Sequence, residues 1–359
     1  MSSSDCCVLE TSSGKFIRNL RVIERNEPSV PLAASMDWTC RCNLACRHCY
    51  VRFPGASNGE MSTAQLKHVL AVMAEGGVLF LVITGGDPLV RSDFEELYVH
   101  AKSLGFIPTI FTNATLVTLA MADMLAAHPP RRIEITVYGH TSQTYDAITG
   151  ILGSFHRFRA GVKALLDRGL LVRMKTMVME ANKHEFAEMK AWAEGCGCEF
   201  RYDAVIHGRM NGDPTATDGR ISPKEVVDLH FERQADKTDF LDYQRSIGPG
   251  LDPKRTLFEC GAGTMTLHVD STGKAHPCML WRQDPYDLLS GRLDQAWLRH
   301  IAGVRNRPPA AGECVSCNDR GLCSYCPPMA IIEAGHPSKP SKYFCEMAAE
   351  RKQQMKISG

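Results

Sequence analysis

The chain has 359 residues, 41 Lys and Arg against 40 Asp and Glu, and a formal net charge of +1. This balance argues against a broad nucleic-acid-binding face, which normally carries an excess of basic residues. No apolar run approaches the ~20 residues of a membrane-spanning helix. The N-terminal sequence MSSSDCC has neither the basic nor the apolar region of a signal peptide. We therefore expect a cytoplasmic protein in a reducing compartment.

From about residue 32 the hydrophobic pattern alternates between strands and helices. The predicted strands span residues 32–38, 78–84, 108–112, 132–138, 171–179 and 199–206. The predicted helices span 62–75, 92–104, a helical stretch that follows the fourth strand and ends at 168, and 183–194. Six strands that alternate with helices predict an α/β fold with right-handed crossovers, in which a parallel sheet forms either a barrel or an open sheet.

In such folds the chemistry lies at the carboxyl ends of the strands. A cysteine-rich loop follows the first predicted strand, the sequence GGDP at 85–88 follows the second, and Thr112 and Asn113 follow the third. Residues 207–255 have the composition of a polar connector, with a helix near 223–233. Beyond Cys260 the alternation stops, and we expect a small domain that is organised by metal instead of a large core.

The cysteines indicate metal or redox chemistry. There are 15, an odd number in a chain too long to be a disulfide scaffold. Cys42, Cys46 and Cys49 place three thiolates in one loop, and a four-iron cluster with three thiolate ligands keeps one iron open for a small molecule. The alternative is a zinc site with four ligands, the fourth from Cys40, but the spacing of Cys40 from Cys42 is awkward for zinc. The pattern favours iron and sulfur.

The CxxxCxxC loop after the first strand, the glycine-rich turn after the second and the β/α alternation resemble the radical S-adenosylmethionine (SAM) superfamily over residues 31–207. The resemblance implies a partial (β/α)6 barrel in which Cys42, Cys46 and Cys49 hold a [4Fe–4S] cluster whose open iron binds SAM. It also implies the reaction: one electron cleaves SAM to methionine and a 5′-deoxyadenosyl radical, which abstracts hydrogen from a substrate.

The same resemblance implies further SAM contacts. Gly85, Gly86 and Asp87 match the GGEP turn that contacts the SAM ammonium group, with Asp87 in place of the usual Glu. His48 occupies the aromatic position beside the adenine, and its alternative is a solvated loop histidine. The remaining implied contacts are Thr112 and Asn113 at a TNG-like strand end that has Ala114 instead of Gly, Thr136 toward the ribose or carboxylate, and Lys175 toward the carboxylate.

The second cysteine group comprises Cys260, Cys278, Cys314, Cys317, Cys323, Cys326 and Cys345. CxxC pairs are also typical of zinc sites, but seven thiolates suit two clusters better than one tetrahedral ion. The pattern resembles the SPASM domain, which holds two auxiliary [4Fe–4S] clusters, although two residues instead of the usual three separate Cys323 from Cys326. The resemblance assigns one cluster to Cys314, Cys317, Cys323 and Cys345, and the cluster nearer the active site to Cys260, Cys278 and Cys326.

The nearer cluster is one ligand short, because no cysteine occurs at 264–266, where some relatives have one. We hypothesise an open or non-cysteine ligand there, able to touch substrate or pass electrons. The other cysteines are expected to be free thiols: Cys6, Cys7, Cys40, Cys196 and Cys198. The general acid or base stays unassigned among the candidates at strand ends: Glu134, Tyr202, Asp203 and His207.

The sequence thus predicts an N-terminal extension (1–30), a radical SAM barrel (31–207), a connector (208–255) and a SPASM domain (256–359). Enzymes of this architecture most often modify peptides, so the first hypothesis is hydrogen abstraction from a ribosomally made peptide, leading to a crosslink, an epimerisation or an oxidation. The alternative is a small-molecule enzyme such as a tetrapyrrole decarboxylase or a cofactor-biosynthesis dehydrogenase. A non-enzymatic electron-transfer protein is disfavoured because it needs no SAM turn.

Two kinds of partner protein follow from this reading. Only 41 residues precede Cys42, too few for a leader-binding module of ~80–90 residues, so any leader binding is expected to need a separate protein. The clusters imply a reductant such as flavodoxin or ferredoxin.

Overall fold

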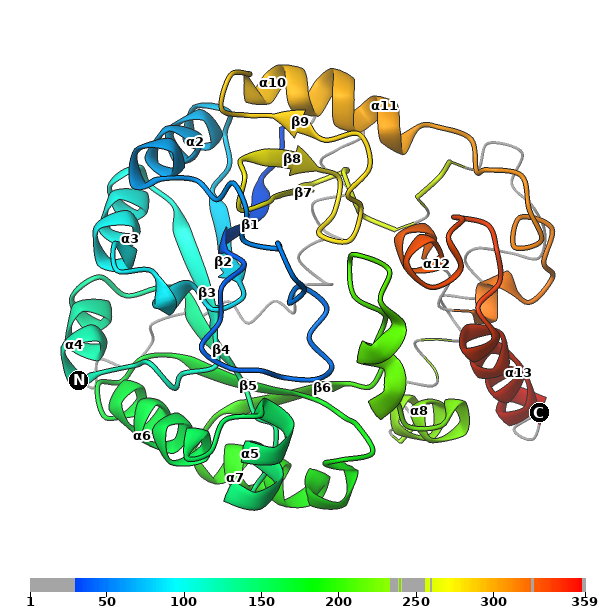
Figure 1. Ribbon diagram of the computed structural model, residues 1–359, viewed down its shortest axis with the longest axis horizontal. Helices are drawn as coiled ribbons and strands as arrows, with labels where there is room; N and C mark the ends of the chain where they lie inside the picture. Colours follow the sequence, from blue (N-terminus) through cyan, green and yellow to red (C-terminus); the bar gives the residue numbers. More distant parts are fainter. Residues whose placement is uncertain are drawn as a thin grey trace, which may run out of the picture.

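The computed structural model describes residues 30–232, 256–258, 260–323 and 326–356, together with Thr238 and Phe240. Figure 1 shows a curved sheet with helices on its outer side, so that its concave side faces the centre of the molecule. The strand order is β6-β5-β4-β3-β2-β1-β7-β8-β9, and every pair from β6 to β7 is parallel. The predicted α/β class with a partial parallel barrel is confirmed. Within these described residues, none of the helices is long and apolar enough to cross a membrane.

All six predicted strands are present, with ends that differ by a few residues from the predicted ones. They are β1 Ala33–Thr39, β2 Phe80–Gly85, β3 Ile107–Thr112, β4 Arg132–Thr136, β5 Val172–Met177 and β6 Glu199–Asp203. The alternation along them separates two faces. Ile133 and Ile135 belong to the core, whereas Glu134 between them pairs with Lys175 of β5 at 3.3 Å. The core side of the sheet is therefore apolar, and charged side chains lie on its opposite face.

The outer layer consists of α2 Thr63–Glu75, α3 Phe94–Ser103, α4 Leu119–Ala127, α5 Ser142–Thr149, α6 Ser154–Leu166 and α7 Phe186–Gly195, with 3-10 turns η1 Pro88–Val90 and η2 Lys183–Glu185. Ser62 is the N-cap of α2, and its side-chain oxygen accepts a hydrogen bond from the Gln65 amide. Helix α4 was not predicted, because its sequence LAMADMLAA lacks a clear polar face. The single predicted stretch up to 168 is two helices, interrupted where Gly150 takes a left-handed φ of 68°.

The segment after Cys260 extends the main sheet, which the sequence did not predict. Strand β7 Thr266–Val269 pairs in parallel with β1, and β8 Lys274–His276 and β9 Tyr286–Asp287 continue it as an antiparallel edge. Helix α10 Leu293–Gln295, the π-helical stretch η4 Ala296–Ile301 and α11 Ala302–Arg305 follow. Leu267, Val269, Trp297 and Ile301 belong to the same core as the barrel. This part of the C-terminal region is therefore organised by a large hydrophobic core.

The remaining elements lie together beside β6, at the right of Figure 1. They are η3 Pro214–Gly219, α8 Pro223–His230, η5 Arg320–Leu322, α12 Pro327–Ala334 and α13 Lys342–Lys356. Val226 and Val227 of α8 share a small core with Phe344 and Met347 of α13. The predicted N-terminal extension, except residue 30, and most of residues 233–255 of the predicted connector lie outside the described residues, and the predicted domain boundaries stay predictions.

Candidate functional site

Three cysteines lie in the loop that leaves the carboxyl end of β1. Burial raises the pKa of the Cys42 thiol to about 11 and that of Cys46 to about 12, and it also raises the pKa of Cys49. Cys42 and Cys49 both oppose the ionisation of Cys46, so the three thiols are close neighbours. Neighbouring thiols with raised pKa values lose their protons readily only when a positive group neutralises the thiolates that form, and bound iron is such a group. The three residues therefore fit a cluster site.

The described residues contain no group of three or more His, Cys, Asp or Glu side chains placed to hold one metal ion. The three thiols are thus neighbours without being arranged around a single ion. Cys40, the predicted fourth ligand of the zinc alternative, lies with its sulfur 3.3 Å from the Ser271 hydroxyl. Burial raises the pKa of Cys40 to about 11. These contacts are those of a free thiol next to the loop.

The glycine-rich turn after β2 lies against the start of the cysteine loop. The Gly86 amide donates to the Thr39 carbonyl at 2.7 Å, and the Asp87 amide donates to the Arg41 carbonyl at 3.0 Å. A Cβ atom on Gly86 would lie 2.2 Å from the Arg41 carbonyl oxygen, and Gly85 has a φ of 128°. Both positions therefore require glycine. The turn fixes where the cysteine loop begins.

Asp87 is turned into the protein and is 1% exposed. Its carboxylate accepts hydrogen bonds from the Leu89 amide at 3.0 Å, the Thr112 hydroxyl at 2.8 Å and the Asn113 amide at 2.8 Å. Burial raises its pKa to about 6, although these three bonds act in the opposite direction. The side chain joins the ends of β2 and β3, and its predicted contact with the SAM ammonium stays a prediction.

Asn113 connects the end of β3 to the cysteine loop. Its side-chain nitrogen Nδ2 donates to the Asn43 side-chain oxygen at 3.0 Å and lies 3.8 Å from the Cys42 sulfur. Ala114 has a φ of 62°, the left-handed conformation that glycine adopts more easily. The backbone of a TNG-like turn is therefore kept although alanine replaces the glycine. Asn113 therefore lies beside Cys42 and Thr112 beside Asp87, and the predicted SAM contacts of both residues stay predictions.

His48 is half-buried and packs against Tyr138, with ring centroids 5.0 Å apart. Burial lowers its pKa to about 4, so the imidazole is neutral near pH 7. Tyr138, which follows β4, acts to lower the pKa of Cys46 and was not among the predicted site residues. A tyrosine directly after a strand was the signal that could have identified it. The pair forms an aromatic wall at the side of the cysteine loop.

The two residues predicted on β4 and β5 are in register with each other. Thr136 pairs with Lys175 across the strands. The Lys175 ammonium lies 3.3 Å from a Glu134 carboxylate oxygen and 3.2 Å from the centroid of the Phe111 ring. Burial lowers the pKa of Lys175, and Glu134 partly offsets this. The Lys175 ammonium therefore contacts two protein groups, the Glu134 carboxylate and the Phe111 ring. Its predicted pairing with the SAM carboxylate stays a prediction.

The four candidate acids and bases are distributed along the strand ends. Glu134 also pairs with Arg173 at 3.0 Å, and the Tyr202 hydroxyl donates to the Leu229 carbonyl at 3.0 Å. The Asp203 carboxylate accepts from the amides of the two following residues. His207 packs against Tyr50 of the cysteine loop with tilted rings, 4.9 Å between ring centroids. Of these residues, His207 is the one in contact with the loop.

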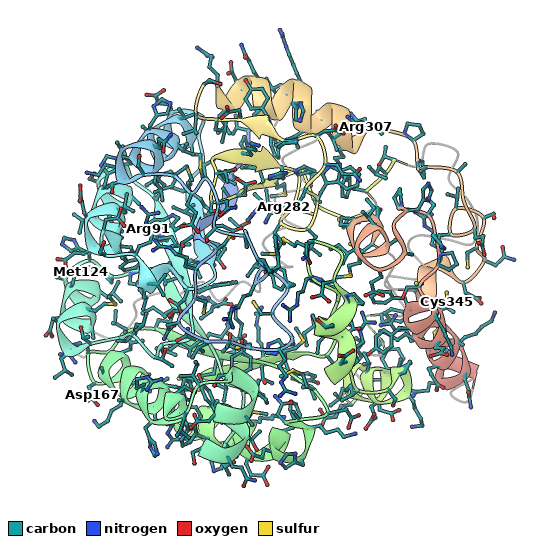
Figure 2. The ribbon with its side chains drawn as sticks, in the orientation of Figure 1. Arg91, Met124, Asp167, Arg282, Arg307 and Cys345 are labelled. Atoms are coloured by element: carbon teal, nitrogen blue, oxygen red, sulfur yellow. The ribbon has the colours of Figure 1, made fainter. Side chains whose placement is uncertain are left out.

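A buried ion network lies beneath the loop and was not predicted. The Asp37 carboxylate, at the end of β1, lies 3.2 Å from His268 of β7 and 3.1 Å from Arg282. Burial acts to raise the pKa of Asp37, but His268 and Arg282 together lower it. Arg282 also acts on the ionisation of Tyr50 and of Cys278. Figure 2 shows Arg282 near the centre of the molecule.

The second cysteine group separates into two sets in space. Cys260 and Cys278 oppose the ionisation of Cys326, and burial raises the pKa of Cys326 to about 12. The second set surrounds Cys323, whose pKa burial raises to about 12 and whose ionisation three other thiols oppose: Cys314, Cys317 and Cys345. Figure 2 places Cys345 at the periphery, on α13. These sets have the same members as the two predicted ligand sets, whose ligation stays a prediction.

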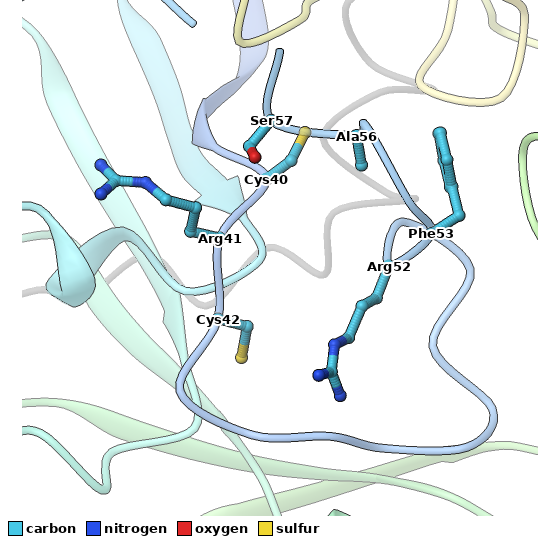
Figure 3. A pocket seen from close by; sticks show the side chains of 7 residues that line it. All are labelled: Cys40, Arg41, Cys42, Arg52, Phe53, Ala56 and Ser57. Atoms are coloured by element: carbon cyan, nitrogen blue, oxygen red, sulfur yellow. The ribbon is translucent and has the colours of Figure 1, made fainter.

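A pocket of about 210 Å³ opens beside the cysteine loop. Figure 3 shows it between the start of the loop and the returning segment. Its lining residues are Cys40, Arg41, Cys42, Arg52, Phe53, Ala56 and Ser57. Since Cys42 is among them, the pocket gives small molecules access to a thiol of the triad.

Comparison with known sequences identifies the barrel. Residues 36–193 match the Radical SAM superfamily. The chain is 24% identical over 346 residues to AdoMet-dependent heme synthase of Nitratidesulfovibrio vulgaris, which covers 88% of this chain and 92% of that protein. It is 25% identical to the subtilosin biosynthesis protein AlbA of Bacillus subtilis (83% of this chain, 70% of that protein). It is 27% identical to the mycofactocin maturase MftC of Mycolicibacterium smegmatis (84% and 80%).

Solved structures agree on the fold. Streptococcus suis SuiB bound to the precursor peptide SuiA superposes with a TM-score of 0.64 at 16% identity, over 96% of this chain and 84% of that chain. The structure of anSMEcpe with bound AdoMet superposes with a TM-score of 0.65 at 14% identity, over 91% and 97%. At these identities the likeness concerns the fold alone.

The family match and the buried cysteine triad together show that residues 36–193 form a radical SAM domain. The family that this domain matches uses SAM and a [4Fe–4S] cluster. The resemblance predicted from the CxxxCxxC loop is confirmed.

Proposed function

We propose that this enzyme abstracts hydrogen from a ribosomally made peptide and thereby crosslinks, epimerises or oxidises it. The observation that carries the proposal is the similarity over most of the chain to AlbA and MftC, whose names describe bacteriocin biosynthesis and mycofactocin maturation. The polar concave face of the barrel supports it, because a peptide offers many polar groups to such a surface.

In the proposed reaction, Cys42, Cys46 and Cys49 would hold the [4Fe–4S] cluster, which when bound and reduced would supply the electron for reductive cleavage of SAM. The other residues of the site keep this loop in place. Asp87 joins two strand ends beside it, and Asn113 donates to the loop through Asn43. His48 stays neutral, so it adds no charge beside the thiolates. The half-buried Tyr138 and His48 rings shield one side of the loop from water.

We further propose two auxiliary [4Fe–4S] clusters in a SPASM-type arrangement. Cys314, Cys317, Cys323 and Cys345 hold one, and Cys260, Cys278 and Cys326 hold the other. The mutual electrostatic effects within each set support this division. The three-cysteine set has an iron with an open or non-cysteine ligand. Mössbauer spectra of the reconstituted protein test this ligation. Spectra in which all irons of both auxiliary clusters have cysteine ligands would contradict the proposal of an open or non-cysteine ligand.

The second candidate is a small-molecule enzyme that acts on a tetrapyrrole. It is favoured by the heme synthase of N. vulgaris, and by pre-heme d1 synthase of Dinoroseobacter shibae, which is 27% identical over 328 residues. Both candidates need the same cysteine triad and differ in the substrate. In either case the enzyme works in the cytoplasm with a flavodoxin or ferredoxin as reductant, and in the peptide case with a separate leader-binding protein where a leader is recognised.

The deciding experiment is a substrate comparison with the reconstituted enzyme, SAM and dithionite. One reaction contains precursor peptides encoded beside the gene, and the other a tetrapyrrole with propionate side chains. If the enzyme modifies peptides, more 5′-deoxyadenosine forms when the peptide is present than when it is absent. A crosslink or an oxidation then lowers the peptide mass by two hydrogens, and an epimerisation inverts one α-carbon. Loss of carbon dioxide from the tetrapyrrole, with the peptides unchanged, would contradict the peptide proposal and support the second candidate.

A further inference from the structure

The segment that follows β6 lies across the cysteine loop. The Arg209 guanidinium donates through Nη1 to the Arg52 carbonyl at 2.9 Å and through Nη2 to the Arg47 carbonyl at 3.2 Å. The Met210 amide donates to the Tyr50 carbonyl at 3.0 Å. These three bonds reach both sides of Cys49, from residues about 160 positions later in the chain.

Arg209 is itself held in place. Its Nε lies 3.5 Å from an Asp213 carboxylate oxygen, and its amide donates to the Asp213 carbonyl at 2.8 Å. One residue earlier, a Cβ atom on Gly208 would lie 3.0 Å from the Ile332 side chain of α12. The segment is therefore a closed turn packed against the helix that begins at Cys326, and not a free loop end.

The chemistry of arginine suits this position. The cysteine loop has little regular secondary structure, so its carbonyl groups need hydrogen-bond donors from elsewhere. A guanidinium is a planar fork that reaches two carbonyls at once, whereas a lysine ammonium reaches one such point. The positive charge of the guanidinium lies in the same place, because its two nitrogens bond to carbonyls on either side of Cys49.

We propose that Arg209 is a positioning residue with two effects. Its guanidinium, bonded to two carbonyls, maintains the conformation of the cysteine loop in the metal-free chain, and its positive charge makes the cluster easier to reduce. The second effect rests on the proposed cluster, whereas the first concerns the metal-free chain. A positive charge near a cluster favours the reduced state, because that state carries one more electron. The two effects separate in variants, since Arg209→Lys keeps the charge and loses the fork.

The first test is limited trypsin digestion of the metal-free, reduced protein. Arg47 and Arg52 are exposed, and cleavage after either one is quantified by mass spectrometry. Loss of two hydrogen bonds of about 0.5–1.5 kcal/mol each predicts cleavage about tenfold faster in Arg209→Gln. Arg209→Lys is expected to fall between Arg209→Gln and the wild type. The matched control is Arg201→Gln, because Arg201 is half-exposed and bonds to Glu199 on the same strand. Equal cleavage rates in Arg209→Gln and the wild type overturn the proposal that Arg209 maintains the loop conformation.

The second test is an EPR-monitored redox titration of the reconstituted proteins without SAM. Arg209→Gln is expected to shift the one-electron reduction equilibrium about tenfold toward the oxidised cluster, a potential about 59 mV more negative. Arg209→Lys and Arg201→Gln should keep the wild-type potential. An unchanged potential in Arg209→Gln overturns the electrostatic effect. If circular dichroism shows that Arg209→Gln does not fold, the cleavage rate of Arg209→Lys tests whether Arg209 maintains the loop conformation. Absence of iron from the wild type contradicts the proposed function, whereas the digestion of the metal-free protein still tests the effect of Arg209 on the loop.

Discussion

Asp87 gives a prediction that separates its structural role from a direct role in binding. The residue is fully buried, and every donor around its carboxylate is a protein group: the Leu89 amide, the Thr112 hydroxyl and the Asn113 amide. Burial nevertheless dominates and raises its pKa from 3.8 to about 6. The native state therefore binds this proton more tightly than the unfolded chain does.

The direction of the pH effect follows from this shift. The contribution of Asp87 to the free energy of unfolding declines as the pH rises from about 4 to about 6, and is constant above that range. Between pH 5 and pH 7 the decline is roughly 1.3 kcal/mol. Asp87→Asn removes the charge, and with it this decline. The variant also turns one amide N–H toward a donor, which costs about 1–3 kcal/mol at both pH values.

The assay is urea unfolding of the metal-free, reduced protein at pH 5 and pH 7. The stability difference between wild type and Asp87→Asn should move in favour of the variant by roughly 1.3 kcal/mol at the higher pH. Asp123→Asn serves as the control, because Asp123 is exposed and its pKa is lowered by Arg168. The reasoning is refuted if the difference is the same at both pH values, or if it moves in favour of the wild type.

Two further substitutions test how the loop and the barrel are held. Gly86→Ala should lower iron retention after reconstitution several-fold, because the new Cβ would meet the Arg41 carbonyl at 2.2 Å, whereas Gly303→Ala has open space and should retain wild-type iron. Arg91→Gln should lower the free energy of unfolding by about 3–5 kcal/mol in urea at pH 7, since the buried guanidinium binds Asp93 and two backbone carbonyls. A loss below about 1 kcal/mol contradicts the second prediction.

The sequence could predict the features that depend on local pattern. Apolar runs bounded by glycine gave the six parallel strands, and the order of those strands put the cysteine loop, the GGDP turn and Asn113 at one edge of the sheet. Ser62 could be identified as a cap because a capping box is a short-range signal. These features need no knowledge of the tertiary structure.

The features that the sequence missed depend on contacts between distant segments. Strand β7 has four residues, too few to show a strand period, and it becomes a strand by pairing with β1 more than 200 residues earlier. The ion network of Asp37 with His268 and Arg282 joins the same two regions. The contacts of Arg209 with the cysteine loop likewise arise only after folding. Tertiary packing determined each of them.

The general acid or base could not be chosen from the sequence, because the choice depends on what surrounds each residue at the strand ends of the barrel. A charged residue at a strand end is equally compatible with structure and with catalysis. The structure shows Glu134 engaged by Arg173 and Lys175, and Tyr202 bonded to the Leu229 carbonyl. His207, by contrast, packs against Tyr50 of the cysteine loop. Only the folded chain distinguishes these environments.

The central claim is that a cluster on Cys42, Cys46 and Cys49 cleaves SAM, and one measurement tests it most directly. The protein is reconstituted anaerobically, its iron and sulfide are counted, and 5′-deoxyadenosine is quantified by mass spectrometry after addition of SAM and dithionite. The account predicts about twelve irons per chain and 5′-deoxyadenosine formation that is lost in Cys46→Ala and kept in Cys196→Ala. Zinc in place of iron, or 5′-deoxyadenosine formation that persists in Cys46→Ala, would contradict it.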